Sequence, residues 1–150
     1  TPAAWNDPVK GAELAKGQKA QGADVIYAAA GGTGVGVLQA AADEGILSIG
    51  VDSNQNYMHP GSVLTSMLKR VDNAVIIAAT ELISSGKLVG GNRVFGLKEG
   101  GVGFAENALN KADLADVREA ILRIRTQIIT GSIVVPDENT DMAAWAKSVR

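Results

Sequence analysis

Apolar and polar positions in the first third of the chain predict a strand, a glycine-rich loop, a helix and a second strand. Residues 24–29 form an apolar run of strand length, and residues 31–36 form a turn rich in glycine. Residues 35–44 then have helical spacing up to a stop at Gly45, and residues 46–51 form a second apolar strand. This order of elements is typical of an α/β fold with a parallel sheet.

Asp52 directly follows the second of these strands. The carboxyl ends of parallel strands share one edge of a sheet, where ligands bind in open α/β folds, so Gly31 and Asp52 are expected to face the same crevice. A carboxylate there can accept hydrogen bonds from the two vicinal hydroxyls of a sugar, each contributing roughly 1.5–3 kcal/mol. The alternative is an aspartate that only caps the loop before Ser53 and Asn54.

The chain opens on a predicted helix rather than on a strand. Asp7 is a helix N-cap residue, Pro8 occupies the first helical position, and the helix runs to about Gln21 before a stop at Gly22. In a doubly wound fold each helix normally crosses between two parallel strands. We therefore expect that a strand, and sequence before it, precede this helix in the complete protein.

The rest of the chain predicts two more strands and further helices. A strand at 62–68 precedes a helix that has Asp72 as its N-cap and ends at Ser85, and the apolar residues of this helix cover more than one face. Such a helix needs neighbours on two sides. Beyond it we expect a strand at 92–97, a second glycine-rich loop at 99–103, an amphipathic helix at 113–130 with Asp113 as cap and Gly131 as stop, and a tail at 136–150 whose short helix carries Trp145.

Composition narrows the class of function. The chain of 150 residues fits one domain, with 46% apolar residues and a net charge of −2, and no basic patch indicates nucleic-acid binding. It contains no cysteine, which excludes disulfides, thiolate catalysis and cysteine-ligated metals. The longest uncharged apolar run, 73–80, is far shorter than the roughly 20 residues of a membrane span.

The glycine-rich loop does not match a phosphate-binding motif. A Walker loop requires Lys and then Ser or Thr after its last glycine, whereas Val37 and Leu38 follow Gly36. The dinucleotide fingerprint fails as well, because Gly32, Gly34 and Gly36 are spaced by two throughout. Two interpretations remain: backbone N–H groups at a helix start that approach a polar ligand, or glycines needed only for a tight turn.

Few side chains in the sequence are suited to catalysis. His59 is the only histidine and has no obvious acid partner, so we expect no catalytic residue, no metal site and no cofactor. Trp5 can stack on a flat ring, worth about 1–3 kcal/mol per base, or can belong to the core or to an interface. Lys69 follows the third predicted strand and either reaches the same sheet edge or is a solvated lysine.

Five motifs of this chain occur together in one known family: WNDP at 5–8, GADVIYAAAGGTGVGV at 22–37, GVDSNQ at 50–55, LTSMLKRVDNAV at 64–75 and GLKEGGVGFA at 96–105. As a set, they resemble the basic membrane protein family of ABC-transporter substrate-binding lipoproteins, of the purine nucleoside receptor type. The resemblance runs over nearly the whole chain.

The resemblance implies one Rossmann-like lobe of a type I periplasmic binding protein, in which two lobes close on a nucleoside. Residues 1–68 would form the first part of the C-terminal lobe, residues 69–88 a crossover helix toward an N-terminal lobe, and residues 89–150 the remainder and the tail. The N-terminal lobe and the lipid-bearing cysteine are absent from this sequence. A periplasmic or cell-surface location, anchored by that lipid, is expected.

The resemblance also implies roles for four residues. Trp5 would stack on the base, where family members often have Phe, and Gly31 would contact the ligand through its backbone. Asp52 would accept hydrogen bonds from the ribose hydroxyls, and Lys69 would bind on the ribose side. Contacts that read the base would belong to the other lobe.

The expected function is that of a solute-binding protein, not an enzyme, which delivers adenosine, guanosine or inosine to an ABC permease. Closure of the two lobes on the ligand would give the permease a shape to recognise. Two alternatives use the same lobe: a nucleoside-processing enzyme and a ligand-sensing regulator. A further possibility is an isolated lobe that lacks half of the cleft and has no activity of its own.

Overall fold

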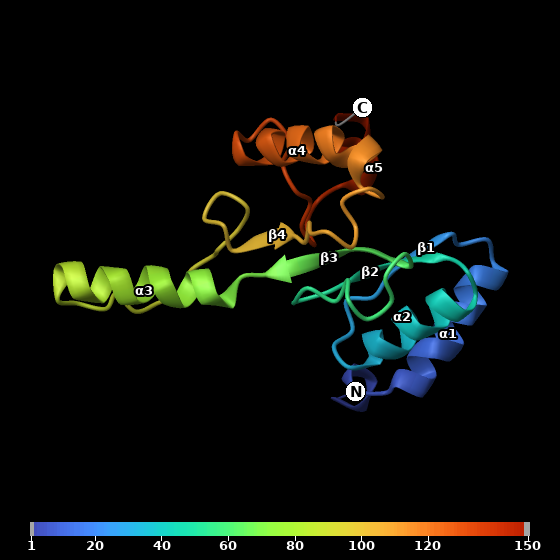
Figure 1. Cartoon of the computed structure of the whole chain (residues 1–150). Coiled ribbons are helices and arrows are strands. Elements are labelled where there is room, and N and C mark those ends of the chain that lie inside the picture. Colours follow the sequence, from blue (N-terminus) through green and yellow to red (C-terminus); the bar gives the residue numbers. More distant parts are fainter. Residues whose placement is uncertain (1, 149–150) are drawn as a thin grey trace. The chain divides into compact units, whose positions relative to one another are not determined.

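The computed structural model describes residues 2–148, which divide into two compact units at Ala115. In chain order the elements are η1 (Pro2–Trp5), α1 (Pro8–Ala20), β1 (Val25–Tyr27), α2 (Thr33–Asp43), β2 (Leu47–Gly50), β3 (Val63–Lys69), α3 (Val71–Ser85), β4 (Val102–Phe104), α4 (Ala115–Ile129) and α5 (Met142–Ser148), as labelled in Figure 1. Residues 1, 149 and 150 of the predicted segments lie outside the described residues.

The first unit is built on a four-stranded sheet in the order β1-β2-β3-β4. Strands β1, β2 and β3 are parallel to one another, and β4 is antiparallel to β3. Tyr27 lies opposite Ile49, and Gly50 lies opposite Ser66. The α/β class and the parallel order of the three predicted strands are therefore confirmed, with an antiparallel strand added at one edge.

Helix α1 begins as its sequence predicts. The Asp7 carboxylate accepts a hydrogen bond of 2.9 Å from the N–H of Lys10, which satisfies one of the donors that a helix start leaves unpaired. Pro8 is the first helical residue and loses nothing there, because that position needs no N–H. After the helix, Gly22 has a left-handed φ of 97°.

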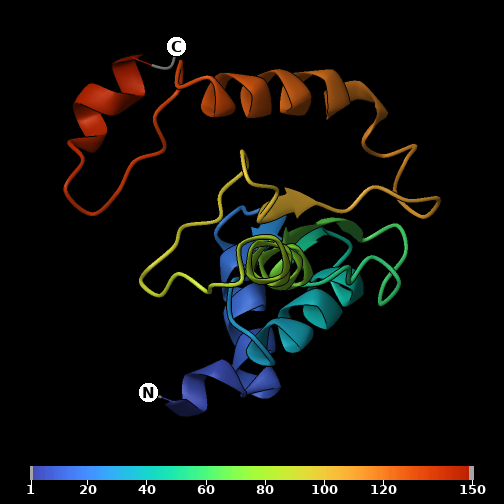
Figure 2. The ribbon, with the colours of Figure 1, turned by 90° about the vertical axis from the view of Figure 1, so that its left-hand side faces the viewer.

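The start of α2 corrects the predicted one, because the helix begins at Thr33 and not at Val35. Two glycines that were expected in the turn, Gly34 and Gly36, are helical. A Cβ on Gly36 would overlap the backbone carbonyl of Pro8, and a Cβ on Gly11 would overlap the carbonyl of Thr33. These glycines thus let the backbones of α1 and α2 touch, and the two helices lie side by side in both Figure 1 and Figure 2.

The core of this layer lies between the helix pair and β1. Ile26 of β1 packs with Ala15 of α1 and with Val37 and Ala40 of α2. The small side chains at these positions match the close approach of the two helices. Dense packing of this kind is what fixes the loops that leave the strands.

Helix α3 also begins earlier than predicted. Its N-cap is Arg70 and not Asp72, which falls in the first turn. The N–H of Arg70 donates at 2.8 Å to the carbonyl of Gly101, the residue before β4, so the chain already has a fixed partner before the helix starts. The hydrogen bond from the Arg70 guanidinium lowers the pKa of the Asp72 carboxyl below its usual value. The predicted stop is confirmed, since Gly86 has a φ of 67°.

The strand predicted at 92–97 is wrong, since the fourth strand, β4, lies in the segment that was expected to be a glycine-rich loop. The chain turns between Gly96 and Gly101, whose N–H donates to the Gly96 carbonyl at 2.8 Å. The Glu99 carboxylate accepts from the Gly96 N–H at 2.9 Å and closes the same turn. Only after this reversal does the chain run alongside the end of β3.

The second unit, residues 116–150, carries most of α4 and all of α5. Helix α4 begins at Ala115, two residues later than predicted, and the stop at Gly131, with a φ of 79°, is confirmed. The short helix around Trp145 is also confirmed. Its indole N–H donates to the Val134 carbonyl at 2.6 Å, which ties α5 to the segment before it.

We predict that Gly36→Ala lowers the free energy of unfolding by roughly 1–3 kcal/mol, because the new methyl group must separate α1 from α2. Gly17→Ala is the matched control, since a Cβ at this α1 position meets no atom within 4 Å. It should raise stability by roughly 0.5–1 kcal/mol through helix propensity. Urea unfolding of both variants measures the difference, and equal behaviour would contradict the described helix contact.

Candidate functional site

The candidate site lies at the edge of the sheet where the three parallel strands end. The loop after β1 contains Gly31, the loop after β2 contains Asp52, and Lys69 is the last residue of β3. Because these strands are parallel neighbours, their carboxyl ends share one edge. The structure therefore places Gly31, Asp52 and Lys69 at this edge, and Trp5 lies beside Gly31.

The first pair is Trp5 and Gly31. Gly31 has a φ of 54°, and a Cβ added to it would lie 3.0 Å from the Trp5 carbonyl oxygen and 3.8 Å from Cε3 of the indole. A side chain at this position would therefore push against the tryptophan. The Trp5 residue is 62% exposed, so its ring is not a core residue within the described chain and has area free for stacking.

Thr33 fixes this pair, and sequence reasoning missed it. Its hydroxyl accepts from the Asp7 N–H at 2.8 Å and donates to the Ala4 carbonyl at 2.6 Å. Thr33 is buried at the start of α2, so these bonds join the segment around Trp5 to the loop around Gly31. A hydroxyl residue among glycines at a helix start is the signal that could have indicated this role.

The second pair is Asp52 and Lys69. Oδ1 of Asp52 lies 3.1 Å from Nζ of Lys69, and the Lys69 N–H donates to the Asp52 carbonyl at 2.9 Å. The two side chains are 48% and 58% exposed, so their attraction contributes about 1 kcal/mol or less to stability. Both charged groups remain accessible from solvent.

The backbone of Asp52 is unusual. With a φ of 67°, it is the one non-glycine residue in the described part of the chain with a left-handed backbone. The Asp52 carboxylate contacts Lys69. Within the described part of the chain it accepts no hydrogen bond from an N–H group of its own loop, which disfavours a purely capping role. The loop is supported from below by buried polar residues, Asn56 and Ser66, which the sequence reasoning also missed.

His59, the histidine considered as a catalytic candidate, does not lie at this edge of the sheet. His59 precedes β3, so it lies toward the opposite edge of the sheet, where its carbonyl accepts from the Ser62 and Val63 N–H groups. Residues 2–148 contain no cluster of three or more potential metal ligands from His, Cys, Asp and Glu. No helix within this range is both long and apolar enough to cross a membrane.

Comparison with known proteins gives the family. The model of the family described as ABC transporter substrate-binding protein PnrA-like matches residues 3–139, and the chain belongs to this family. It is 36% identical over 129 residues to basic membrane protein D of Borreliella burgdorferi, which covers 84% of this chain and 38% of that protein. With basic membrane protein A of Borreliella afzelii the identity is 32% over 135 residues, covering 88% and 41%. The chain thus spans about two fifths of the length of these curated relatives.

Two solved structures share the fold. A solute-binding protein of an ABC transporter system from Aeropyrum pernix superposes with a TM-score of 0.70 at 27% identity, over 95% of this chain and 48% of that one. A transcriptional activator of the comK gene from Bacillus halodurans gives a TM-score of 0.74 at 29% identity, over 85% and 44%. The predicted lobe of a periplasmic-binding-protein fold is thereby confirmed.

We predict that Asp52→Gly is more stable than Asp52→Ala by roughly 1–2 kcal/mol, because only glycine adopts the left-handed backbone without strain. The same two substitutions at Gln18, on the exposed face of α1, should show the reverse order by roughly 0.8–1.0 kcal/mol. Urea unfolding of the four variants tests this. An alanine variant at position 52 as stable as the glycine variant would show that this backbone is not strained in solution.

Proposed function

We propose that this chain is the C-terminal portion of a two-lobed solute-binding protein that captures a purine nucleoside for an ABC permease. One observation carries the proposal: Trp5 with Gly31, and Asp52 with Lys69, lie at the same edge of the sheet. An accessible aromatic ring and an accessible carboxylate suit the two halves of a nucleoside, a flat base and a sugar with vicinal hydroxyls.

In this proposal each residue has a defined role. The indole of Trp5 stacks on the base, while the backbone at Gly31 lies close to the ligand because no side chain intervenes. The Asp52 carboxylate accepts hydrogen bonds from the ribose hydroxyls, and the Lys69 ammonium donates on the same side while it keeps the carboxylate oriented. In this proposal the ligand is bound and released unchanged, as in a substrate-binding protein.

The other half of the cleft belongs to an N-terminal lobe, toward which residues 69–88 cross. Helix α3 supports this part of the proposal, because none of its residues is buried in the described chain. Its largest exposed apolar side chains are Val71, Val75, Ile76, Leu82 and Ile83. Apolar exposure of this extent along one helix is typical of a surface that another domain covers.

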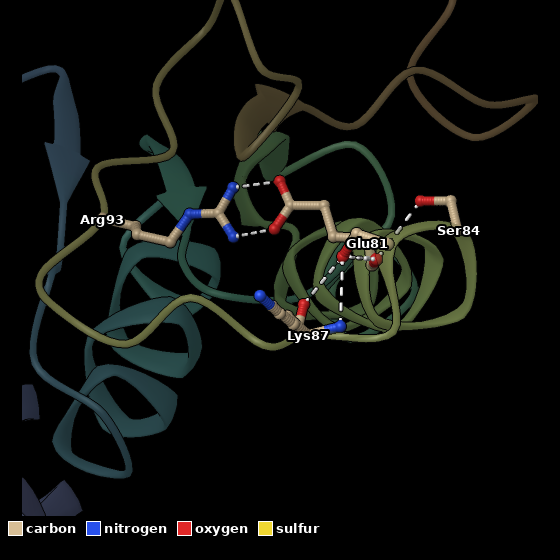
Figure 3. A network of polar contacts seen from close by, with 5 residues as sticks. Glu81, Ser84, Lys87 and Arg93 are labelled. Atoms are coloured by element: carbon tan, nitrogen blue, oxygen red, sulfur yellow. Dashed lines mark hydrogen bonds and ion pairs between the residues drawn. The ribbon is translucent and has the colours of Figure 1, made fainter.

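The segment after α3 is fixed along the helix, as Figure 3 shows. The Arg93 guanidinium donates to both carboxylate oxygens of Glu81, at 2.6 and 2.7 Å, and lies 5.3 Å from the centre of the Phe95 ring. The hydrogen bond from Arg93 lowers the pKa of the Glu81 carboxyl below its usual value. These contacts keep α3 and the returning chain together as one arm for the proposed crossover.

The two lobes close when the nucleoside bridges them, and the permease recognises the closed shape. The complete protein is proposed to act outside the cytoplasm, in the periplasm or on the cell surface, with a lipid on its N-terminal part as the anchor. Its partners are the nucleoside, the permease and the N-terminal lobe, without nucleic acid as a ligand.

A second candidate is a ligand-sensing regulator, which the likeness to the comK activator favours. Such a protein would bind its ligand with the same edge of the sheet and would carry a DNA-binding segment elsewhere. Specific binding of the complete protein to a DNA fragment, changed by nucleoside, would support this candidate against the transport function.

We predict that the complete two-lobed protein binds guanosine, adenosine or inosine with quenching of Trp5 fluorescence, recorded in a Trp145→Phe background so that, of the two tryptophans in this chain, Trp5 alone reports. Asp52→Asn should weaken binding roughly 10-fold to 100-fold, because each charge-assisted hydrogen bond contributes roughly 1.5–3 kcal/mol. The matched control is Asp72→Asn, which changes an exposed carboxylate paired with Arg70 and should leave affinity unchanged.

Two results would contradict this function. A panel of nucleosides that produces neither quenching nor binding heat would exclude a nucleoside ligand. Free base released during incubation, detected by chromatography, would instead favour a nucleoside-processing enzyme.

We also predict that Ile83→Asp destabilises the two-lobed protein by roughly 1.5–3 kcal/mol, because it places a charge where an apolar side chain becomes buried. In the isolated chain, where Ile83 is 85% exposed, the same substitution should have little effect. Val9→Asp on α1, at another exposed apolar position, is the control and should be neutral in both forms. Equal effects of Ile83→Asp in the two forms would show that α3 does not contact the other lobe.

A further inference from the structure

The loop that carries Asp52, residues 51–56, rests on a buried network of hydrogen bonds. Ser66 of β3 and Asn56 are both fully buried, and the Ser66 hydroxyl donates to Oδ1 of Asn56 at 2.7 Å. The same hydroxyl accepts from the Gln55 N–H at 3.0 Å. Gln55 turns its side chain back, so that its Oε1 accepts from the Val51 N–H at 2.8 Å. One hydroxyl is thus connected to both ends of the loop.

Gly50 makes this arrangement possible. It lies opposite Ser66 in the register of β2 and β3, directly before the loop. A Cβ on Gly50 would lie 2.7 Å from the Ser66 hydroxyl and 2.8 Å from Oε1 of Gln55. Since real Cβ atoms do not approach other atoms so closely, the network and the glycine depend on each other.

Stability alone does not explain the composition of this loop. Nδ2 of Asn56 is buried and has no hydrogen-bond partner among the described residues, which costs free energy. Asp52 adds a second cost through its left-handed backbone. Both costs fall within five residues of one loop, and that loop carries the carboxylate of the candidate site. A buried polar network that specifies one loop conformation accounts for both.

We propose that Ser66 is a positioning residue for ligand binding: it holds the loop 51–56 in the one conformation that presents the Asp52 carboxylate, beside Lys69, to the sugar hydroxyls. This inference rests on the proposed function, in which Asp52 binds those hydroxyls. Ser66 itself is buried beneath the loop and acts on the ligand only through Asp52. Without its hydroxyl, the N–H of Gln55 and the amide of Asn56 lose their common partner, and Asp52 relaxes from its left-handed backbone.

The test is Ser66→Ala in the complete two-lobed protein, with Ser48→Ala as the matched control. Ser48 is also fully buried, on the neighbouring strand β2, but among the described residues its hydroxyl reaches only the Ser62 carbonyl, at 3.4 Å. We expect Ser66→Ala to weaken guanosine binding roughly tenfold or more, as the loss of one charge-assisted bond would. Ser48→Ala should leave the affinity unchanged.

A second ligand separates positioning from a general loss of structure. The affinity for 2′,3′-dideoxyguanosine, which lacks the hydroxyls, should be the same in Ser66→Ala and in the unmodified protein. In an Asp52→Ala background, Ser66→Ala should cause no further loss of guanosine affinity, because the two substitutions remove the same interaction.

Several outcomes overturn the inference. If Ser66→Ala lowers the affinity for both ligands equally, its role is structural only. The same holds if it lowers the affinity for guanosine no more than Ser48→Ala does. If Ser66→Ala does not fold, Gln55→Met, which removes the acceptor for the Val51 N–H, must show the same selective loss, with Gln39→Met on the surface of α2 as its control. An unmodified protein that binds both ligands equally contradicts the contact between Asp52 and the sugar hydroxyls, and one that binds neither contradicts the proposed function itself; the inference falls in both cases.

Discussion

The backbone contact between α1 and α2 is the constraint on which the rest of the candidate site depends. With no side chain at Gly36, the carbonyl of Pro8 lies against α2. This contact brings the start of α1 next to the start of α2, where the buried hydroxyl of Thr33 bonds to both Asp7 and Ala4. These contacts hold Trp5 beside Gly31, although the tryptophan is not packed in a hydrophobic core. Gly36, one of the glycines that suggest a ligand-binding loop in the sequence, therefore acts first as a packing residue.

Local and periodic signals made the first half of the fold predictable. The N-cap at Asp7, the glycine stops and the apolar runs each act within a few residues, so their positions follow from the sequence. The position of Lys69 at the same sheet edge as Asp52 followed as well, because parallel strands bring their carboxyl ends together whatever the side chains are; the ion pair between the two was not predicted. The errors have the opposite cause. The start of α2 depends on Thr33, whose partners Asp7 and Ala4 lie 26 and 29 residues earlier in the chain, and the extra strand β4 is defined by its partner at the end of β3, not by its own sequence. Ser66 was missed for the same reason, since its partners lie 10 and 11 residues away.

The energetic features of the site point away from stability as their reason. An exposed ion pair adds little, a left-handed aspartate costs free energy, and so does a buried amide nitrogen that has no partner among the described residues. Another buried asparagine of the first unit has hydrogen-bond partners for both ends of its amide. Asn110 donates to the carbonyls of Leu64 and Ala105 and accepts from the Asn107 N–H. Asn110 thus anchors its loop without an unpaired group, whereas Asn56 belongs to a loop that is held in a strained conformation. Strain of this kind persists where the surrounding structure fixes a group for a task.

The accessibility of the site in this half explains how binding would be coupled to closure in the proposed function. The Trp5 ring and the Asp52 and Lys69 charges are largely solvated in the described chain, and hydrogen bonds in water add little because water competes for both partners. Covering the edge with a second lobe removes that competition and strengthens each polar contact in the lower dielectric. Most of the free energy of binding is then gained only in the closed state. A ligand can shift a conformational equilibrium only by its difference in affinity for the two states, so a half-site that binds weakly by itself is what a closure-dependent receptor requires.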